Sequence, residues 1–457
     1  MGNDEIYTFE VARQPHFTTI WSVLKTGADN HPPMDYWLRH LSMSLFGSSP
    51  LAFRLPSLVA IWITAILLFL LFCHRVLPVY GASAALLMLL ACGQTLAVND
   101  RGYALLLGCF ASALYAWDQF EARPSSIWYP GLFALSLILA VYSHYYGVLF
   151  FVAFGLAAVV RSLLQRRLWI QPFLLLGGAA LACGPLWALA KTASQYRANF
   201  WTPVDLNAAL DFYANLLSPV APALVFMGVL LGMALLQSPA DEWSRRLALS
   251  RDSILAIGVF ACLPAPLFIV ARLVTGAFAP RYVYEAGVAF CVLLVVLAAN
   301  LPLTSRWRAV IFLGVPMVFL TIATLRLARA LTFTYREDFV TALVQLQETS
   351  EFPVVLGDDG LFVELAYSHP GALKNCYFLY DVVPDRRTNV DLAVRGLQQV
   401  MPLQAQTYDS MKAAHPTFVF IGTWGPLLAR AVADGGTVHY RPSATVTDYW
   451  IVSTASK

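Results

Sequence analysis

Long runs of apolar residues recur through the first three quarters of the chain, separated by short polar segments. Each run is close to the length of about 20 residues that an α-helix needs to cross the hydrocarbon core of a membrane. The pattern predicts a polytopic α-helical membrane protein with about ten transmembrane helices, at residues 54–73, 78–99, 102–119, 128–143, 145–161, 169–190, 219–237, 253–275, 282–300 and 308–326.

Two segments outside these runs alternate apolar and polar residues with helical spacing. The first is HPPMDYWLRHLSMSLFG, at residues 31–47, and the second is DLNAALDFYANLLSP, at residues 205–219. A helix with one apolar and one polar face can lie along a membrane surface. We therefore expect an interfacial helix in each segment.

From about residue 336 the pattern changes to short strand-like runs that alternate with helical stretches. FPVVLG, YFLYDVV, PTFVFIGT and DYWIVS are predicted strands, and REDFVTALVQLQET, residues 391–400 and residues 425–433 are predicted helices. Such alternation is typical of an α/β domain. The predicted organisation is therefore a first loop with interfacial helices (1–50), a transmembrane core (51–330) and a small α/β domain (331–457).

Composition and charge support this organisation and assign its two sides. Only 12% of the residues are charged and 58% are hydrophobic, whereas a soluble domain has about 25% charged residues. Cytoplasmic loops carry the excess of Lys and Arg. One set of loops holds most of the arginines, while the alternate set holds only Arg101, Lys191, Arg197 and Arg281. The alternate set, the first 50 residues and the α/β domain are therefore predicted to lie outside.

The candidate functional residues lie at the ends of the predicted spans on this outer side. The spans themselves contain almost no charged residues at mid-depth. A secondary transporter usually places its polar site near the midplane. A carboxylate can act as a general base towards a hydroxyl, and arginine is suited to gripping phosphate. The pattern favours group transfer from a lipid-linked phosphate by residues among Asp4, Glu5, His31, Arg54, Asp100, Arg101, Tyr103, His144, Arg281 and Tyr282.

The order of these motifs resembles that of the GT-C membrane glycosyltransferases. The motifs are DE at 4–5, NHPPMDYWLRHLSMSLFG, LAFRLPS, NDRGYAL, SHYYG and APRYVY. The sequence is similar to the branch of protein O-mannosyltransferases and lipid A aminoarabinose transferases, especially to bacterial members with a carboxyl-terminal α/β domain. The resemblance covers about residues 4–330 with motif support.

The resemblance implies an inverting transfer of a sugar from a polyprenyl-phosphate donor on the periplasmic face of the bacterial inner membrane. The acceptor would be a cell-envelope glycan, a lipid or a protein; membrane lipids are further partners, and nucleic acid is not. Asp4 would be the general base, and Glu5 would orient the site or help to bind a metal. The donor phosphate would be held by Arg101, Arg281 and His31, with the substrate surrounded by Arg54, Tyr103, His144 and Tyr282.

Two departures from the family pattern stand out. Aminoarabinose-transferring relatives carry a lysine before the Pro-Pro pair, where this chain has His31. The charge of a histidine near pH 7 depends on its surroundings, unlike that of a lysine. Family members also carry a membrane helix before the DE loop. Only Met1-Gly2-Asn3 precede it here, and we expect an upstream start or a truncated gene model.

Structural readings of the same residues stay open at this point. Asp4 and Glu5 could be a charge pair at a helix amino terminus. The arginines could anchor helix ends to lipid headgroups, and Asp358-Asp359-Gly360 reads most simply as a turn. A transporter or flippase for a lipid-linked sugar and a non-catalytic sensor are the alternative functions. The spacing leaves the metal unknown, with Mg²⁺ or Mn²⁺ as candidates.

Overall fold

The computed structural model describes residues 3–73, 76–98, 101–195, 204, 206–237, 249–276, 278–331, 337–383, 389–442 and 448–454. Its internal contacts divide the chain into two compact units. One unit is His31–Ala330, and the other joins Met1–Asn30 to Leu331–Lys457. Each unit has its own apolar core. A division near residue 330 also follows from the sequence pattern. That pattern groups residues 1–50 together, whereas the internal contacts divide them after Asn30.

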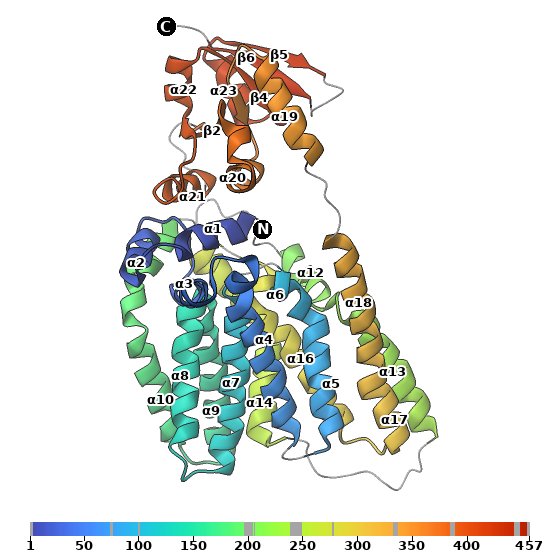
Figure 1. The fold of residues 1–457 in the computed structure, drawn as a ribbon. Helices are drawn as coiled ribbons and strands as arrows, with labels where there is room; N and C mark the ends of the chain where they lie inside the picture. Colours follow the sequence, from blue (N-terminus) through green and yellow to red (C-terminus); the bar gives the residue numbers. More distant parts are fainter. Residues whose placement is uncertain are drawn as a thin grey trace. The chain divides into compact units, whose positions relative to one another are not determined.

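The unit His31–Ala330 is a bundle of apolar helices (Figure 1). Each predicted apolar run coincides with one helix or one series of consecutive helical segments, which confirms the polytopic helical architecture. The segments are α4 (Pro50–Cys73), α5 (Pro78–Met88), η1 (Leu89–Gly93), α6 (Gln94–Val98), α7 (Tyr103–Ala122), α8 (Trp128–Ser143), η2 (Tyr145–Gly147), α9 (Val148–Leu164), α10 (Ile170–Ala182), η3 (Gly184–Leu186), α11 (Trp187–Ala193), α13 (Ala221–Leu236), α14 (Arg251–Ala261), α15 (Pro264–Val270), η5 (Ala271–Thr275), η6 (Pro280–Val283), α16 (Tyr284–Ala298), α17 (Ser305–Ala309), η7 (Val310–Gly314) and α18 (Val315–Leu331).

By length and composition, five helical runs of the described residues can cross a membrane by themselves. Three further pairs are bent at a short break, by 40°, 83° and 48°, and raise the number to eight if each pair is one span. The two remaining predicted spans are α7 and α8. Helix α8 has only 16 residues, and α7 carries Asp118 near its carboxyl end.

Both predicted interfacial helices are present as helices. The first is α3 (Met34–Phe46), and the second is α12 (Leu206–Leu217). The polar residues Asp35, Arg39 and Ser42 of α3 lie on its buried face, together with Tyr36 and Met43. Leu45 and Phe46 are about two-thirds exposed.

Arg39 joins α3 to the start of α4. Its Nε donates to the carboxylate of Asp35 at 2.9 Å, and Nη1 donates to the carbonyl of Phe53 at 2.7 Å. Its Nη2 donates to the hydroxyl of Ser57 at 3.0 Å. The guanidinium also lies 4.4 Å from the ring centroid of Phe53. Asp35 and Arg39 of the DYWLRH motif and Ser57 of the FRLPS motif thus pair with one another in the protein interior.

The other unit begins with α1 (Asn3–Ala12) and α2 (Phe17–Lys25). Ile6 and Tyr7 of α1 belong to the apolar core that the carboxyl-terminal residues form. A side chain on Gly396 of α21 (Asn389–Leu397) would place its Cβ 2.2 Å from Cα of Ala28. Only glycine permits so close an approach. The first 30 residues are therefore packed as part of the α/β unit.

The α/β unit contains one six-stranded sheet with the strand order β3-β2-β1-β4-β6-β5. Strands β1, β2, β3 and β4 are parallel, and β6 and β5 continue the sheet in antiparallel pairing. The predicted strands are confirmed as β1 (Val354–Leu356), β2 (Cys376–Tyr380), β4 (Thr417–Ile421) and β6 (Tyr449–Ser453). The sequence did not predict β3 (Ala405–Thr407) or β5 (Thr437–Arg441).

The three predicted helices of this domain are also present, as α19 (Glu337–Thr349), α21 and α23 (Pro426–Ala433). Two further helices, α20 (Asp359–Ser368) and α22 (Tyr408–Ala414), and the short η8 (Pro370–Leu373) complete the unit. The parallel strands with intervening helices confirm the predicted α/β class.

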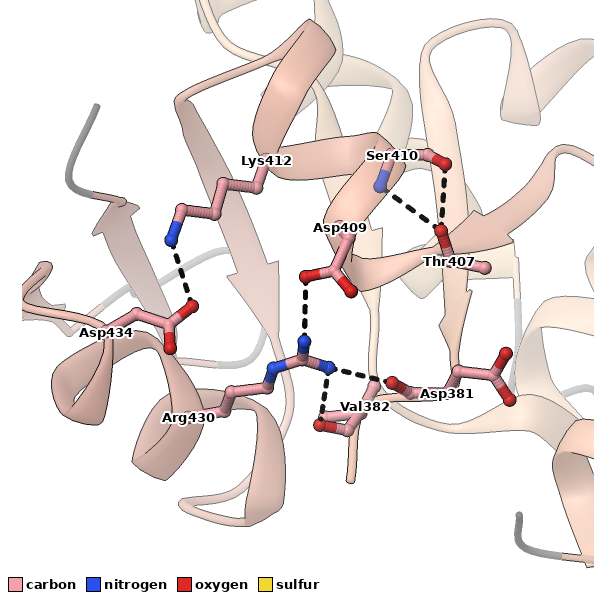
Figure 2. Close-up of polar contacts among 8 residues, drawn as sticks. All are labelled: Asp381, Val382, Thr407, Asp409, Ser410, Lys412, Arg430 and Asp434. Carbon is pink, nitrogen blue, oxygen red and sulfur yellow. Dashed lines mark hydrogen bonds and ion pairs between the residues drawn. The ribbon is translucent and has the colours of Figure 1, made fainter. Parts of the chain in front are cut away.

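Arg430 of α23 ties together the segments that follow β2 and β3 (Figure 2). Its guanidinium donates to the carbonyls of Asp381 and Val382 at 2.8 and 3.0 Å and to the carboxylate of Asp409 at 2.7 Å. Asp381 has a left-handed backbone, with φ of 53°. The charged donor on its carbonyl stabilises this turn.

Candidate active site

The segments that begin and end helices at one end of the bundle bring six of the predicted residues together. His31 precedes α3, Arg101 precedes α7, and Tyr103 is the first residue of α7. His144 lies between α8 and η2, and the short helix η6 carries the last two. The six residues come from four separate parts of the sequence and are His31, Arg101, Tyr103, His144, Arg281 and Tyr282.

Arg101 and His31 form the polar contact at the centre of this cluster. Nη1 of Arg101 lies 3.1 Å from Nδ1 of His31. A guanidinium has only N–H donors, so Nδ1 of His31 is the acceptor and its ring hydrogen lies on Nε2. His31 is 8% exposed, and Arg101 is half-buried. One edge of the guanidinium is therefore held by an imidazole.

Rings of histidine and tyrosine surround His144. Its ring centroid lies 5.2 Å from that of His31, 5.1 Å from Tyr103 and 5.5 Å from Tyr282. The guanidinium carbon of Arg281 lies 5.7 Å from the ring centroid of Tyr282. Aromatic faces attract guanidinium groups. The two arginines therefore lie beside one cluster of rings, which we call the aromatic cluster.

Tyr146, which the sequence analysis did not single out, belongs to the aromatic cluster. Its ring stacks on Tyr282 with a centroid distance of 5.2 Å, and its hydroxyl lies 2.6 Å from Oγ1 of Thr275. Its backbone N–H donates to Nδ1 of His144 at 3.2 Å. Tyr146 lies in the SHYYG motif two residues after His144, and an uncharged tyrosine there does not by itself mark a site.

The glycine of the RGY segment allows this assembly. A Cβ on Gly102 would lie 2.4 Å from the carbonyl oxygen of Ser143, the last residue of α8. Backbone atoms cannot accommodate such a contact without moving. The start of α7 and the end of α8 are therefore in direct contact. Arg101 and Tyr103 reach His144 for this reason.

The positive charge of the cluster is concentrated on its two arginines. Burial is the largest influence on His144, followed by the neighbouring His31, Arg101 and Arg281, and together they hold its pKa well below the ordinary value. The imidazole of His144 is therefore neutral at physiological pH. Two fixed guanidinium charges beside neutral rings make a site suited to an anion such as a phosphate.

The remaining predicted residues have different positions. Arg54 is half-buried in the first turns of α4, and the contacts described above do not include it. Asp100 lies outside the described residues. Asp4 lies in the first turn of α1, and its side chain is also outside the described set. Glu5, the next residue of α1, is 2% exposed within the α/β unit.

The donor atoms of the aromatic cluster do not suit Mg²⁺ or Mn²⁺. These ions prefer carboxylate and carbonyl oxygens, whereas the cluster offers guanidinium, imidazole and phenol groups. Among the described residues, no three His, Cys, Asp or Glu side chains lie close enough together to hold a metal ion. The aromatic cluster therefore does not fit a divalent cation, and a cation held with the help of Glu5 stays a prediction.

Part of the chain matches a family of known proteins. Residues 30–187 match the family described as dolichyl-phosphate-mannose-protein mannosyltransferase. The matched range contains His31, Arg54, Arg101, Tyr103 and His144. No curated protein sequence matches the chain.

Solved structures match over the whole chain. ArnT from Cupriavidus metallidurans in the apo state has 13% identity and a TM-score of 0.51, with 100% of this chain and 95% of ArnT covered. The same protein bound to undecaprenyl phosphate has 15% identity and a TM-score of 0.51, with 99% and 94% covered. An Archaeoglobus fulgidus oligosaccharyltransferase complex with zinc and sulfate has 13% identity, a TM-score of 0.45, and 98% and 69% covered. At such identities the ArnT likeness shows a shared fold.

Proposed function

We propose that the chain is a membrane glycosyltransferase of the GT-C superfamily, on the basis of the partial family match and the shared fold. It transfers a sugar from a polyprenyl-phosphate donor to an acceptor at the membrane surface. The donor phosphate binds to Arg101 and Arg281, and His31 orients Arg101. Tyr103, His144 and Tyr282 line the space beside the phosphate. Arg54, at the start of α4, contacts the substrate beyond this cluster.

One observation carries the proposal: two arginines lie beside a cluster of neutral rings at one end of an apolar bundle. The contact of 3.1 Å between Arg101 and His31 fixes that guanidinium beside the rings. A lipid-linked phosphate has a polar head and an apolar tail. A cationic site at the end of membrane-spanning helices matches both parts of such a molecule.

The arginines also serve the chemistry of the leaving group. In an inverting transfer the acceptor oxygen forms a bond to the anomeric carbon while the bond from that carbon to the phosphate oxygen breaks. Polyprenyl phosphate leaves with the electron pair of that bond. Fixed positive charges stabilise the negative charge that develops on the phosphate, because they do not have to reorganise during the reaction.

The acceptor needs a group that removes its proton. We assign this role to Asp4, on the basis of its place at the start of the DE motif, with Glu5 as a group that orients it. A carboxylate accepts the hydroxyl proton as the new glycosidic bond forms, so that the proton is transferred from the acceptor to Asp4. No step of this scheme uses a metal ion.

Sidedness follows from the charge bias of the loops. The arginine-poor loops contain Arg101 and Arg281, and the positive-inside rule assigns such loops to the outer face. In a bacterial inner membrane that face is periplasmic. The acceptor is accordingly a cell-envelope glycan, lipid or protein.

A transfer assay with a panel of donors tests the proposal. Membranes that contain the full chain are incubated with radiolabelled polyprenyl-phosphate mannose, glucose, N-acetylglucosamine and aminoarabinose. We expect one of these labels to move into a glycan, lipid or protein fraction, and membranes without the chain to show no such transfer. If a donor instead crosses the bilayer with its sugar–phosphate bond intact, a flippase is the correct function and the proposal fails.

A further inference from the structure

The α/β unit contains a cavity of about 500 Å³ at the carboxyl ends of two neighbouring parallel strands. Leu356 ends β1, and Ile421 ends β4, and both line the cavity. In the order β3-β2-β1-β4 the chain continues from β1 to β2 and β3 on one side and then returns to β4 on the other side of β1. Strands β1 and β4 therefore flank a topological switch point. Open α/β sheets bind ligands in the crevice at such a point. The volume is within the range of about 300–1,000 Å³ for small-molecule sites.

Three aromatic rings form one wall of this cavity. Trp450 lies between the other two, with ring centroids 5.3 Å from Trp424 and 5.0 Å from Tyr440. Its indole N–H donates to the carbonyl of Gly422 at 3.1 Å, which fixes the ring. Trp424 is 57% exposed and Tyr440 is 48% exposed. Large rings exposed around a fixed indole provide flat apolar surfaces for a ligand.

Two carboxylates border the same cavity. Asp448 accepts a hydrogen bond from the hydroxyl of Tyr440. Asp358 accepts the backbone N–H of Leu361 with Oδ1 at 2.7 Å and so caps the first turn of α20. Each carboxylate has two oxygens and several lone pairs. Further hydrogen bonds from ligand hydroxyl groups can therefore be accepted at the rim.

The acidic residues at the rim make this cavity different from the nucleotide site that other α/β domains have at the same place in the fold. A nucleotide-binding α/β domain uses a glycine-rich loop after its first strand, and the free amino terminus of the next helix binds phosphate. Here Asp358 occupies that helix terminus with its own carboxylate. The negative charges of Asp358 and Asp448 oppose an anionic ligand.

We propose that this cavity binds a sugar unit of a glycan. One face of a pyranose ring carries C–H groups and packs on a flat aromatic ring such as Trp424, while its hydroxyl groups donate to carboxylates such as Asp448. This site is separate from the proposed transfer reaction and does not depend on it, because none of the residues that line it, between Phe339 and Trp450, has a role in that reaction.

Equilibrium binding to the purified full chain in detergent tests the proposal. Saturation-transfer NMR is recorded with methyl mannoside, methyl glucoside, methyl galactoside, N-acetylglucosamine, glucosamine, maltose and chitobiose, and with choline as a cationic probe that is not a sugar. We expect at least one sugar to bind. Trp424→Ala should weaken it at least about tenfold, and Asp448→Asn should weaken it less.

Trp128→Ala is the matched control, because Trp128 is 80% exposed in the helical bundle. Its affinity for the sugar should equal that of the unmodified chain. The proposal is overturned if none of the sugars binds, if only choline binds, or if Trp424→Ala binds as tightly as Trp128→Ala. Binding is measured without a donor, so these outcomes do not bear on the transferase proposal.

Discussion

Arg39 and Arg101 have different surroundings, and this difference indicates a structural role for the first and a functional role for the second. Arg39 is fully buried, and its N–H groups donate to Asp35, Phe53 and Ser57. Arg101 is half-buried and contacts the imidazole of His31. A guanidinium surrounded by protein acceptors holds helices together. A guanidinium that is partly exposed beside neutral rings can bind a phosphate.

Asp4→Asn tests the proposed general base. The amide keeps the size of the side chain but cannot take a proton, so kcat for sugar transfer should fall by about 10²–10⁴-fold while donor binding stays unchanged. Transfer of labelled sugar and donor binding are measured on the same preparation. Glu351→Gln is a control that removes a carboxylate from a position that the proposed mechanism does not use. Full transfer activity in Asp4→Asn would remove Asp4 from this role.

Glu10 gives the α/β unit a dependence on pH. It is 1% exposed on α1, and its Oε2 lies 2.7 Å from Nη2 of Arg13, whose side chain is 45% exposed. Burial raises the pKa of Glu10 to about 7, and the attraction of Arg13 opposes this only in part. Because the folded protein holds this proton more tightly than the unfolded chain, the contribution of Glu10 to stability is fully present below pH 4.5 and is lost as the pH rises through about 7.

Thermal unfolding at pH 6 and pH 8.5 measures this effect. The loss of Tm over this interval should be about 2–5 °C smaller in Glu10→Gln than in the unmodified chain. Glu348→Gln is the matched control, since Glu348 is exposed on α19, and it should behave as the unmodified chain does. Equal pH dependence in all three proteins would contradict the prediction.

The candidate site was partly predictable from single residues. His31, Arg101, Tyr103, His144, Arg281 and Tyr282 could be identified because the parity of the spans puts their helix ends on one side. Tyr146 was missed because a tyrosine within an apolar turn gives no signal of its own. The role of Arg39 was missed because its sequence context fits an amphipathic helix, and only packing reveals that Arg39 lies on the buried face of α3.

At the scale of elements, the contact between the start of α7 and the end of α8 holds the site together. Gly102→Ala would place a Cβ 2.4 Å from the carbonyl oxygen of Ser143, so the two helix ends must separate. We expect donor binding to weaken about tenfold or more and Tm to fall.

Gly131→Ala is the control for this change. Gly131 lies in α8, and a Cβ there would meet no atom within 4 Å. The substitution should leave donor binding unchanged and should stabilise the helix slightly, because alanine has the higher helix propensity. Equal donor binding in Gly102→Ala and Gly131→Ala would show that this helix contact does not position the site.

The elements themselves were largely predictable because their patterns are local. Apolar runs of membrane length mark the bundle helices, and short apolar runs between helical stretches mark β1, β2, β4 and β6. Strand β5 was missed because most of its residues are exposed, and the alternation of Val438 and Tyr440 with polar residues is too short to form a clear signal. Strand β3 was missed because its three residues, Ala405–Thr407, are only half-buried and too few to form a pattern.

At the scale of the whole molecule, the sequence could not predict which segments pack together over long distances in the chain. Ile6 and Tyr7 share an apolar core with residues more than 300 positions later. An apolar residue in a short helix does not identify its partner. Charge bias does predict sidedness, since it depends only on loop composition.

Single-cysteine labelling tests that sidedness. In a cysteine-free background, Val432→Cys, on the exposed face of α23, should react with a membrane-impermeant maleimide added to intact cells from which the outer membrane has been removed. Leu164→Cys, exposed at the end of α9 beside arginines predicted to be cytoplasmic, should react only after lysis. The reverse labelling pattern would invert the topology and place the α/β unit inside.

Binding of undecaprenyl phosphate tests the central claim, that Arg101 and Arg281 hold the donor phosphate. Radiolabelled undecaprenyl phosphate is titrated into nanodiscs that contain the full chain, Arg281→Ala, Arg101→Ala or the control Arg306→Ala, whose arginine is exposed at the opposite end of the bundle. We predict that each of the first two variants binds at least about tenfold more weakly and that Arg306→Ala binds normally. Equal affinity in all four proteins would contradict the claim.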